Sequence, residues 1–135
     1  MRPDPRAEGL RWLAQAERDL DDARAVRDIG RFHLTCFLAQ QSAEKALKAA
    51  LYHAGEEEVF GHSVADLTRL AEPKVPGLVA LAGTGATLDK YYIPTRYPNG
   101  LPGGIPSDAY GPEDAELAIR TADRVLAAIR SAIRP

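Results

Sequence analysis

The sequence is poor in the residues that build disulfides and metal centres. It contains one cysteine, Cys36, so an internal disulfide and an all-cysteine zinc site are both excluded. A single cysteine is typical of a reducing compartment, and we expect a cytoplasmic protein. The histidines at positions 33, 53 and 62 are too far apart in sequence to share one turn of a helix. We therefore predict no metal site and no cofactor.

Long apolar runs and an excess of one charge are also missing. No segment approaches the roughly 18 apolar residues that span a bilayer, so we expect no membrane segment. Seventeen basic and 19 acidic residues give a formal net charge of −2, which excludes a strong overall positive field for nonspecific nucleic-acid binding. A local basic patch is still compatible with this balance. The length of 135 residues predicts a single domain, residues 1–135, with one core.

No window alternates with period two for long enough to predict a strand, and the apolar pattern is helical instead. Apolar residues recur at intervals of three and four over residues 8–29 and 32–54. Gly30 and Gly55 stand where these two helices are expected to end. The short break at Gly30 predicts an antiparallel hairpin. Ser63 is the expected N-cap of a short helix that ends before Pro73.

The second half of the chain is divided by its proline and glycine content. A helix is predicted from about residue 76 to residue 92, although each of its two glycines costs about 1 kcal/mol. Residues 93–112 hold five prolines and four glycines, which predicts a long loop. A last helix over 113–133 has acids in its first turn and arginines at its end, as the helix dipole favours. The fold class is all-α, an antiparallel up-and-down helical bundle of four main helices plus one short helix.

Three segments, taken in order, resemble the HEPN family of small helical domains. They are Cys-Phe-Leu-Ala-Gln-Gln-Ser-Ala-Glu-Lys-Ala-Leu-Lys at 36–48, Gly-His-Ser at 61–63 opening a helix, and Tyr91-Tyr92 ahead of Arg96-Tyr97-Pro98. The similarity extends to the first and last helices and covers nearly the whole chain. It implies a helical bundle that usually forms a homodimer, with a groove for a nucleotide or RNA. It also implies a minimal nucleotidyltransferase as partner, in a toxin–antitoxin-like pair.

The resemblance does not extend to the ribonuclease motif of the family. Members that cut RNA carry an arginine followed four to six residues later by a histidine, late in the domain. No histidine follows Arg96 in this sequence. Arg27 and His33 match the spacing, but about one such match is expected by chance, and these two lie at the first hairpin turn. We therefore assign no catalytic residue and lean away from an enzyme.

Two alternatives to a binding protein stay open. In a ribonuclease toxin without the usual motif, Arg96 would stabilise charge on the phosphate and His62 would move the proton. In a purely structural module, the bundle would serve dimerisation alone.

The second predicted helix supplies half of the candidate ligand-binding residues. Gln41, Glu44, Lys45 and Lys48 recur at spacings of three and four, which predicts that they share a helix face. That face is either solvated, with Glu44 paired to Lys48, or a polar wall toward the proline-rich segment with a lysine available to a phosphate. Gln40 falls in the apolar stripe, where a buried amide needs a hydrogen-bond partner.

The proline-rich segment supplies the other main candidate, Arg96. A guanidinium binds phosphate or carboxylate through two parallel hydrogen bonds, and neighbouring tyrosines stack on a base. The structural alternative is that Arg96 ties the loop to a carboxylate such as Glu44. His62 is expected at a helix entry, packed against the loop, with a general base as the alternative. The full candidate set is Gln41, Glu44, Lys45, Lys48, His62, Tyr92, Arg96 and Tyr97.

Overall fold

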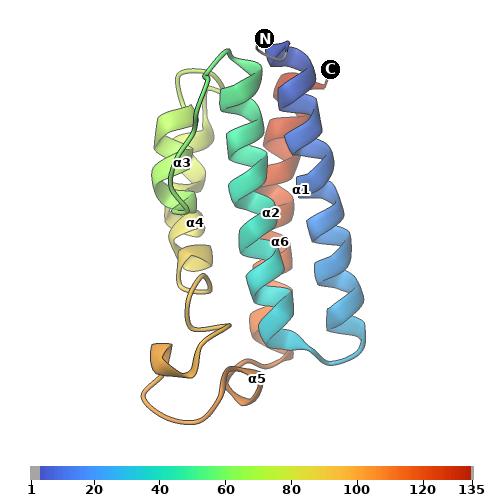
Figure 1. Ribbon diagram of the computed structural model, residues 1–135, viewed down its shortest axis with the longest axis vertical. Coiled ribbons are helices and arrows are strands. Elements are labelled where there is room, and N and C mark those ends of the chain that lie inside the picture. Colours follow the sequence, from blue (N-terminus) through green and yellow to red (C-terminus); the bar gives the residue numbers. More distant parts are fainter. Residues whose placement is uncertain (1–3, 135) are drawn as a thin grey trace.

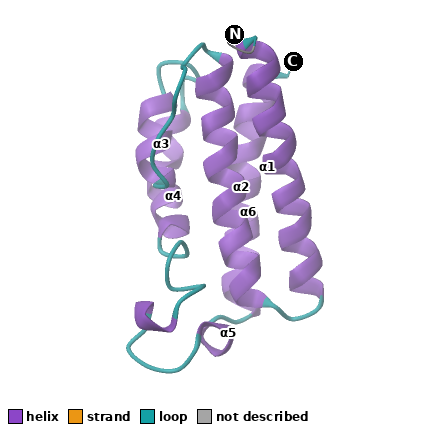
Figure 2. Ribbon diagram, viewed as in Figure 1, coloured by secondary structure: helices purple, strands orange, loops and turns teal. Residues whose placement is uncertain are grey.

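The computed structural model describes residues 4–134, which form an all-helical bundle without strands (Figures 1 and 2). Its three long helices are α1 (Pro5–Asp28), α2 (Phe32–His53) and α6 (Pro112–Ile133). Helix α1 is antiparallel to both α2 and α6 (Figure 1). The all-α bundle and its α1–α2 hairpin are thus confirmed. No helix within 4–134 is long and apolar enough to cross a membrane.

Two shorter helices, α3 (Val64–Ala71) and α4 (Ala82–Asp89), pack beside α2. The predicted helix over residues 76–92 is therefore shorter than expected, and a 3-10 turn, Leu78–Leu81, precedes it. The reason lies at Gly77, which has a φ of +99° that a right-handed helix does not allow. The proline-rich segment holds a 3-10 turn, Pro98–Gly100, and the short α5 (Pro106–Ala109). Both start at a proline, as its fixed φ favours.

The core contains the leucine and alanine positions that the helical periodicity predicts, among them Leu13, Leu20, Leu47 and Leu126, all without exposed surface. Cys36 is equally buried. Burial raises the pKa of its thiol to about 12, and the negative charge of Asp114 acts in the same direction. Cys36 is therefore a small apolar core residue, as its place in the stripe predicted.

Helices α1 and α2 lie in close contact at Gly9. A Cβ atom added to Gly9 would lie 2.5 Å from the Cβ of His53 and 2.8 Å from the carbonyl oxygen of Ala49. Nearby, the rings of Trp12 and Tyr52 pack with centroids 5.0 Å apart. Only glycine therefore allows this spacing of the two backbones.

Both chain ends lie at one end of the bundle, and the proline-rich segment with α5 lies at the opposite end (Figure 1). The segment returns to α6 through Gly111, whose N–H donates to the carboxylate of Asp114 over 2.8 Å. This hydrogen bond caps the first turn of α6.

We expect the stability of the protein to depend on pH because of Glu72, which binds the turn before α4. The carboxylate of Glu72 accepts the N–H groups of Gly77 at 2.9 Å and Val79 at 2.8 Å, and these hydrogen bonds lower its pKa. A lowered pKa in the folded state stabilises the protein above the ordinary value of 4.5, and this gain disappears as the pH falls through the folded pKa. We expect Glu72→Gln to lower the melting temperature at pH 7, by a gap that narrows toward pH 3. Thermal unfolding followed by circular dichroism measures this gap, and a constant gap would contradict the assignment.

Candidate ligand-binding site

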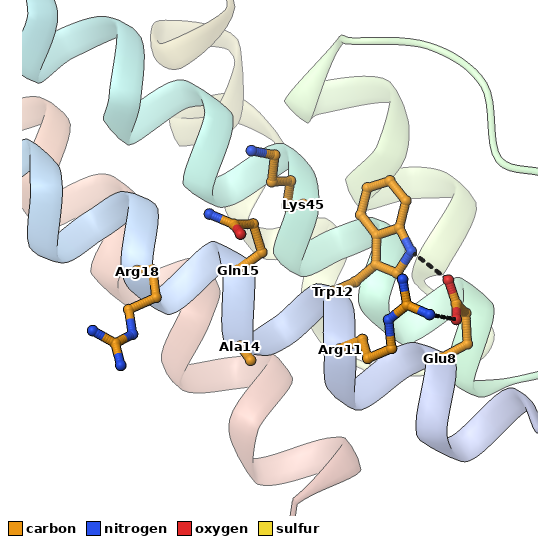
Figure 3. A pocket seen from close by; sticks show the side chains of 7 residues that line it. All are labelled: Glu8, Arg11, Trp12, Ala14, Gln15, Arg18 and Lys45. Carbon is orange, nitrogen blue, oxygen red and sulfur yellow. Dashed lines mark hydrogen bonds and ion pairs between the residues drawn. The ribbon is translucent and has the colours of Figure 1, made fainter.

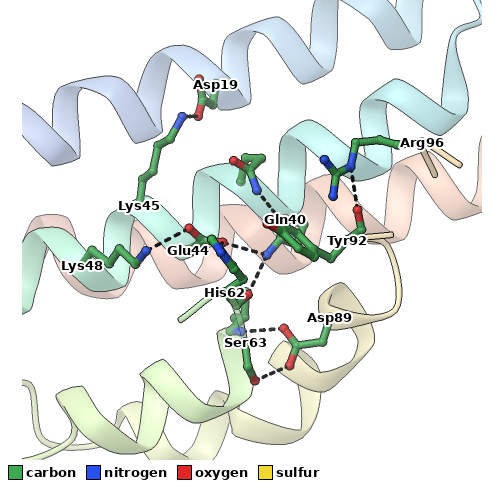
Figure 4. A network of polar contacts seen from close by, with 12 residues as sticks. Asp19, Gln40, Glu44, Lys45, Lys48, His62, Ser63, Asp89, Tyr92 and Arg96 are labelled. Carbon is green, nitrogen blue, oxygen red and sulfur yellow. Dashed lines mark hydrogen bonds and ion pairs between the residues drawn. The ribbon is translucent and has the colours of Figure 1, made fainter. Parts of the chain in front are cut away.

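A row of polar side chains lines the side of α2 next to the start of α3 (Figure 4). Gln40 is fully buried, and its Nε2 donates to the carbonyl of His62 over 2.9 Å and to Oε1 of Glu44 over 3.3 Å. Gln41 Nε2 donates in turn to Oε1 of Gln40 over 2.7 Å. The prediction that a buried amide at position 40 needs partners is confirmed.

Glu44 is the centre of this row. Its Oε2 pairs with Nζ of Lys48 at 3.2 Å, and its Oε1 lies 3.2 Å from Nδ1 of His62. The side chains of Glu44 and Lys48 are only 6% and 8% exposed, so the alternative of a solvated face is wrong for this pair, although the pairing of Glu44 with Lys48 that it included is confirmed. The side chain of His62 is 57% exposed. The ammonium of Lys48 is thus paired with Glu44 in the interior of the protein. His62 is the member of this row that reaches the surface.

Arg96 lies among aromatic rings rather than beside a carboxylate. Its guanidinium carbon is 4.6 Å from the ring centroid of Phe37, 4.7 Å from Tyr92 and 5.2 Å from Tyr97. Its Nε donates to the carbonyl of Tyr92 over 2.8 Å. The alternative in which Arg96 ties the loop to a carboxylate such as Glu44 is wrong, because within residues 4–134 Arg96 pairs with no carboxylate and its Nε binds the carbonyl of Tyr92 instead. Within residues 4–134 the terminal amino groups of Arg96 have no hydrogen-bond or ion-pair partner.

The polar row and the arginine meet at one stacked pair of rings. His62 and Tyr92 stack with centroids 4.7 Å apart and an interplanar angle of 16°. Six of the eight candidate residues are therefore linked by contacts into one network, with Gln40 joining Gln41 to Glu44, with Glu44 and Lys48 buried and with Tyr97 at its edge, as the labelled side chains of Figure 4 show in part: Gln41, Glu44, Lys48, His62, Tyr92 and Arg96. Phe37 was missed, although it precedes Gln41 by four residues and its helical spacing could have indicated it.

The start of α3 holds His62 in place. Ser63 caps the helix by accepting the N–H of Asp66 over 3.1 Å, as the sequence predicted. Its hydroxyl donates to the carboxylate of Asp89 over 2.8 Å, and Asp89 also accepts the N–H groups of Val64 and Ala65. Asp89 has no sequence signal for this role, because it lies 26 residues beyond Ser63.

Lys45 lies apart from this surface. Its Nζ pairs at 2.6 Å with Asp19 of α1, which also accepts from Gln15 over 2.9 Å. The prediction that Lys45 shares a face with Glu44 is wrong, because consecutive residues of a helix are about 100° apart around its axis.

Arg27 and His33, which match the spacing of the ribonuclease motif, do not form a common site. Arg27 pairs with Asp28 at 3.1 Å and with Glu116 at 3.4 Å. Burial and the positive charge of Arg31 lower the pKa of His33. Within the described residues, no group of three or more histidine, cysteine or acidic side chains is placed to hold a metal ion.

These features define a small helical-bundle protein with an arginine held on aromatic rings beside a stacked histidine. The HEPN domain model matches residues 10–132, and the chain belongs to the HEPN family. A curated relative named "Putative toxin MJ1304", from Methanocaldococcus jannaschii, is 25% identical over 132 residues, which cover 91% of this chain and 86% of the relative.

Two solved structures are similar over nearly their whole length. TT1696 from Thermus thermophilus has a TM-score of 0.88 at 36% identity, covering 93% of this chain and 98% of the other. ST0689, described as an archaeal HEPN homologue, has a TM-score of 0.77 at 36% identity, covering 94% of this chain and 98% of the other. The bundle described above is therefore a HEPN fold.

Proposed function

We propose that this chain is a cytoplasmic nucleotide- or RNA-binding protein of a toxin–antitoxin-like pair, and that its ligand binds at Arg96. The observation that carries the proposal is the guanidinium within about 5 Å of three rings, with its terminal amino groups free. The similarity to a protein named as a toxin supports the class of system.

The chemistry of the surface suits a phosphate joined to a base. The two terminal amino groups of Arg96 suit bidentate binding of phosphate. Tyr97, which is 50% exposed, and His62 offer rings on which a base stacks. Gln41 adds an amide at the same surface. In this proposal Glu44 and Lys48 position His62, and Lys45 takes no part because it is turned toward α1.

The first test is binding of a fluorescein-labelled RNA oligonucleotide and of AMP. We expect Arg96→Ala to weaken binding at least tenfold, and Arg96→Lys to weaken it less, because lysine keeps the charge but loses the bidentate geometry. Arg124→Ala, an exposed arginine of α6, is the matched control and should leave the affinity unchanged. Melting curves confirm folding of each variant. A wild-type protein that binds neither probe would point to a module for dimerisation alone.

The partners are tested separately. We propose that the chain forms a homodimer and pairs with a minimal nucleotidyltransferase. Analytical ultracentrifugation should give twice the mass of the chain, and co-expression with a nucleotidyltransferase from the same genome should give a stable complex. A monomer that elutes without its co-expressed partner would contradict this part of the proposal.

A ribonuclease toxin is the second candidate, supported by one further distance. The ring of His62 and the guanidinium of Arg96 each lie 4.7 Å from the ring of Tyr92, so an acid–base group and a phosphate-binding group flank the same side chain. Expression should then arrest growth and degrade RNA, and His62→Ala or Arg96→Ala should relieve both effects. Intact RNA in cells that express the wild type would discard this candidate.

A further inference from the structure

A groove with two exposed apolar side chains lies where the segment 55–63 runs back along α3, before the chain turns into that helix (Figure 1). We call it the Phe60 groove; it is lined by residues 60–63 and, from α3, by Asp66, Leu67 and Leu70. Phe60 is 80% exposed and Leu70 is 58% exposed, whereas Leu67 is buried. Single exposed apolar residues are ordinary, but two that line one groove are typical of a surface that contacts another molecule.

The size of the Phe60 groove indicates what kind of occupant it takes. Its volume is about 180 Å³. Pockets for small molecules and cofactors have roughly 300–1,000 Å³, so the groove is too small for a ligand of that class. A single leucine-sized side chain inserted from a protein partner suits it better, because protein contacts concentrate their binding energy in such anchors.

Negative charge is concentrated around the Phe60 groove. Three exposed glutamates, residues 56–58, stand two to four positions before Phe60. Asp66 lines the groove, and its side chain is 82% exposed although it pairs with Arg69 at 3.4 Å. Residues 56–72 hold five acids and one arginine, a formal net charge of −4, whereas the whole chain has −2. A partner with basic side chains is therefore favoured.

The same charges disfavour the other occupants. Acids repel the phosphates of a nucleic acid and the anionic headgroups of a membrane. A second copy bound through the same face would place acid against acid. Two cations of the chain, Arg11 and Arg18, line a separate cavity on α1, on the other side of α2 (Figure 3). Contact between that face and the groove of another copy would be head-to-tail, which gives a ring or a filament instead of a closed dimer.

We propose that the Phe60 groove docks a basic amphipathic segment of a different protein. One apolar side chain of that segment fills the groove, and its lysines or arginines pair with Asp66 and with the glutamates at 56–58. An apolar centre with a charged rim is the usual anatomy of a protein–protein contact. The groove is separate from the Arg96 network except at His62, which lines the groove and also stacks on Tyr92.

The test is fluorescence anisotropy with a labelled synthetic helix of leucine and lysine, in which the leucines recur at intervals of three and four. We expect saturable binding that weakens about tenfold or more in Phe60→Ser, because the apolar contact is lost. Glu56→Gln combined with Glu58→Gln should weaken binding about threefold and reduce its dependence on salt. Ile105→Ser removes an apolar side chain that is 50% exposed in the proline-rich segment. This matched control should bind like the wild type.

Four results would overturn the proposal: no binding of the lysine peptide, equal binding of a peptide with glutamate in place of lysine, unchanged binding by Phe60→Ser, or a halved mass of Phe60→Ser in ultracentrifugation. The last would show that this face joins two copies of the chain. Melting curves confirm that Phe60→Ser is folded, as expected for so exposed a side chain. Arg96→Ala should bind the peptide like the wild type, because Arg96 does not line the groove. Failure of docking at Phe60 is thereby distinguished from failure of the ligand binding proposed at Arg96.

Discussion

Replacing Glu44 with alanine should lower the free energy of unfolding by about 3–5 kcal/mol. The carboxylate of Glu44 is the ion-pair partner of Lys48, whose side chain is 8% exposed, and it also pairs with His62. Without Glu44, the ammonium would stay buried with no counter-charge. Urea denaturation of the wild type and Glu44→Ala measures the loss.

A double variant separates the effect of the two charges of the Glu44–Lys48 pair from the effect of the volume that the two side chains fill. Glu44→Leu with Lys48→Met removes both charges and keeps the apolar bulk, so it should be much more stable than Glu44→Ala. Arg69→Met, which breaks an exposed pair with Asp66, is the control and should cost less than about 1 kcal/mol. A cost for Glu44→Ala no larger than that of the control would show that the pair does not stabilise the bundle.

Gly9→Ala should destabilise the protein by about 1–3 kcal/mol, because the added methyl group overpacks the contact between α1 and α2. It would lie 2.5 Å from His53 Cβ and 2.8 Å from the Ala49 carbonyl, and neither atom is at the end of a flexible side chain. The helices must separate to admit it. The measurement is again the free energy of unfolding in urea.

Gly83→Ala is the matched control for this variant. Gly83 lies within α4, and a Cβ there meets nothing within 4 Å, so alanine should stabilise the protein by up to about 1 kcal/mol. Equal changes in both variants would mean that the close approach at Gly9 does not limit the packing of the two helices.

The long helices were predictable because their signals are local. Apolar spacing marked α1, α2 and α6, Gly30 marked the hairpin turn, and Ser63 marked the start of α3, where its hydroxyl caps the helix. Burial of Gln40 followed from the same spacing, because an amide in an apolar stripe points into the core.

The remaining features depend on contacts between distant segments. The hydroxyl of Ser63 donates to Asp89, and the ammonium of Lys45 pairs with Asp19. These partners are 26 residues apart in sequence, so the spacing of residues within one helix gives no sign of them. Burial of the Glu44–Lys48 pair depends on the neighbouring segment around His62, so spacing alone could not separate a solvated face from a covered one. The turn before α4 is also held by a contact that spacing does not report, because the carboxylate of Glu72 accepts the backbone N–H groups of Gly77 and Val79.

The placement of both chain ends at one pole of the bundle has a practical consequence for engineering. A fluorescent reporter or affinity tag attached to either end stands away from the segment that carries Arg96, so pull-downs and growth assays leave that surface uncovered. A short linker between the ends would also give a circular permutant, opened at the exposed Gly103, in which the 93–112 segment is cut while α1, α2 and α6 keep their packing.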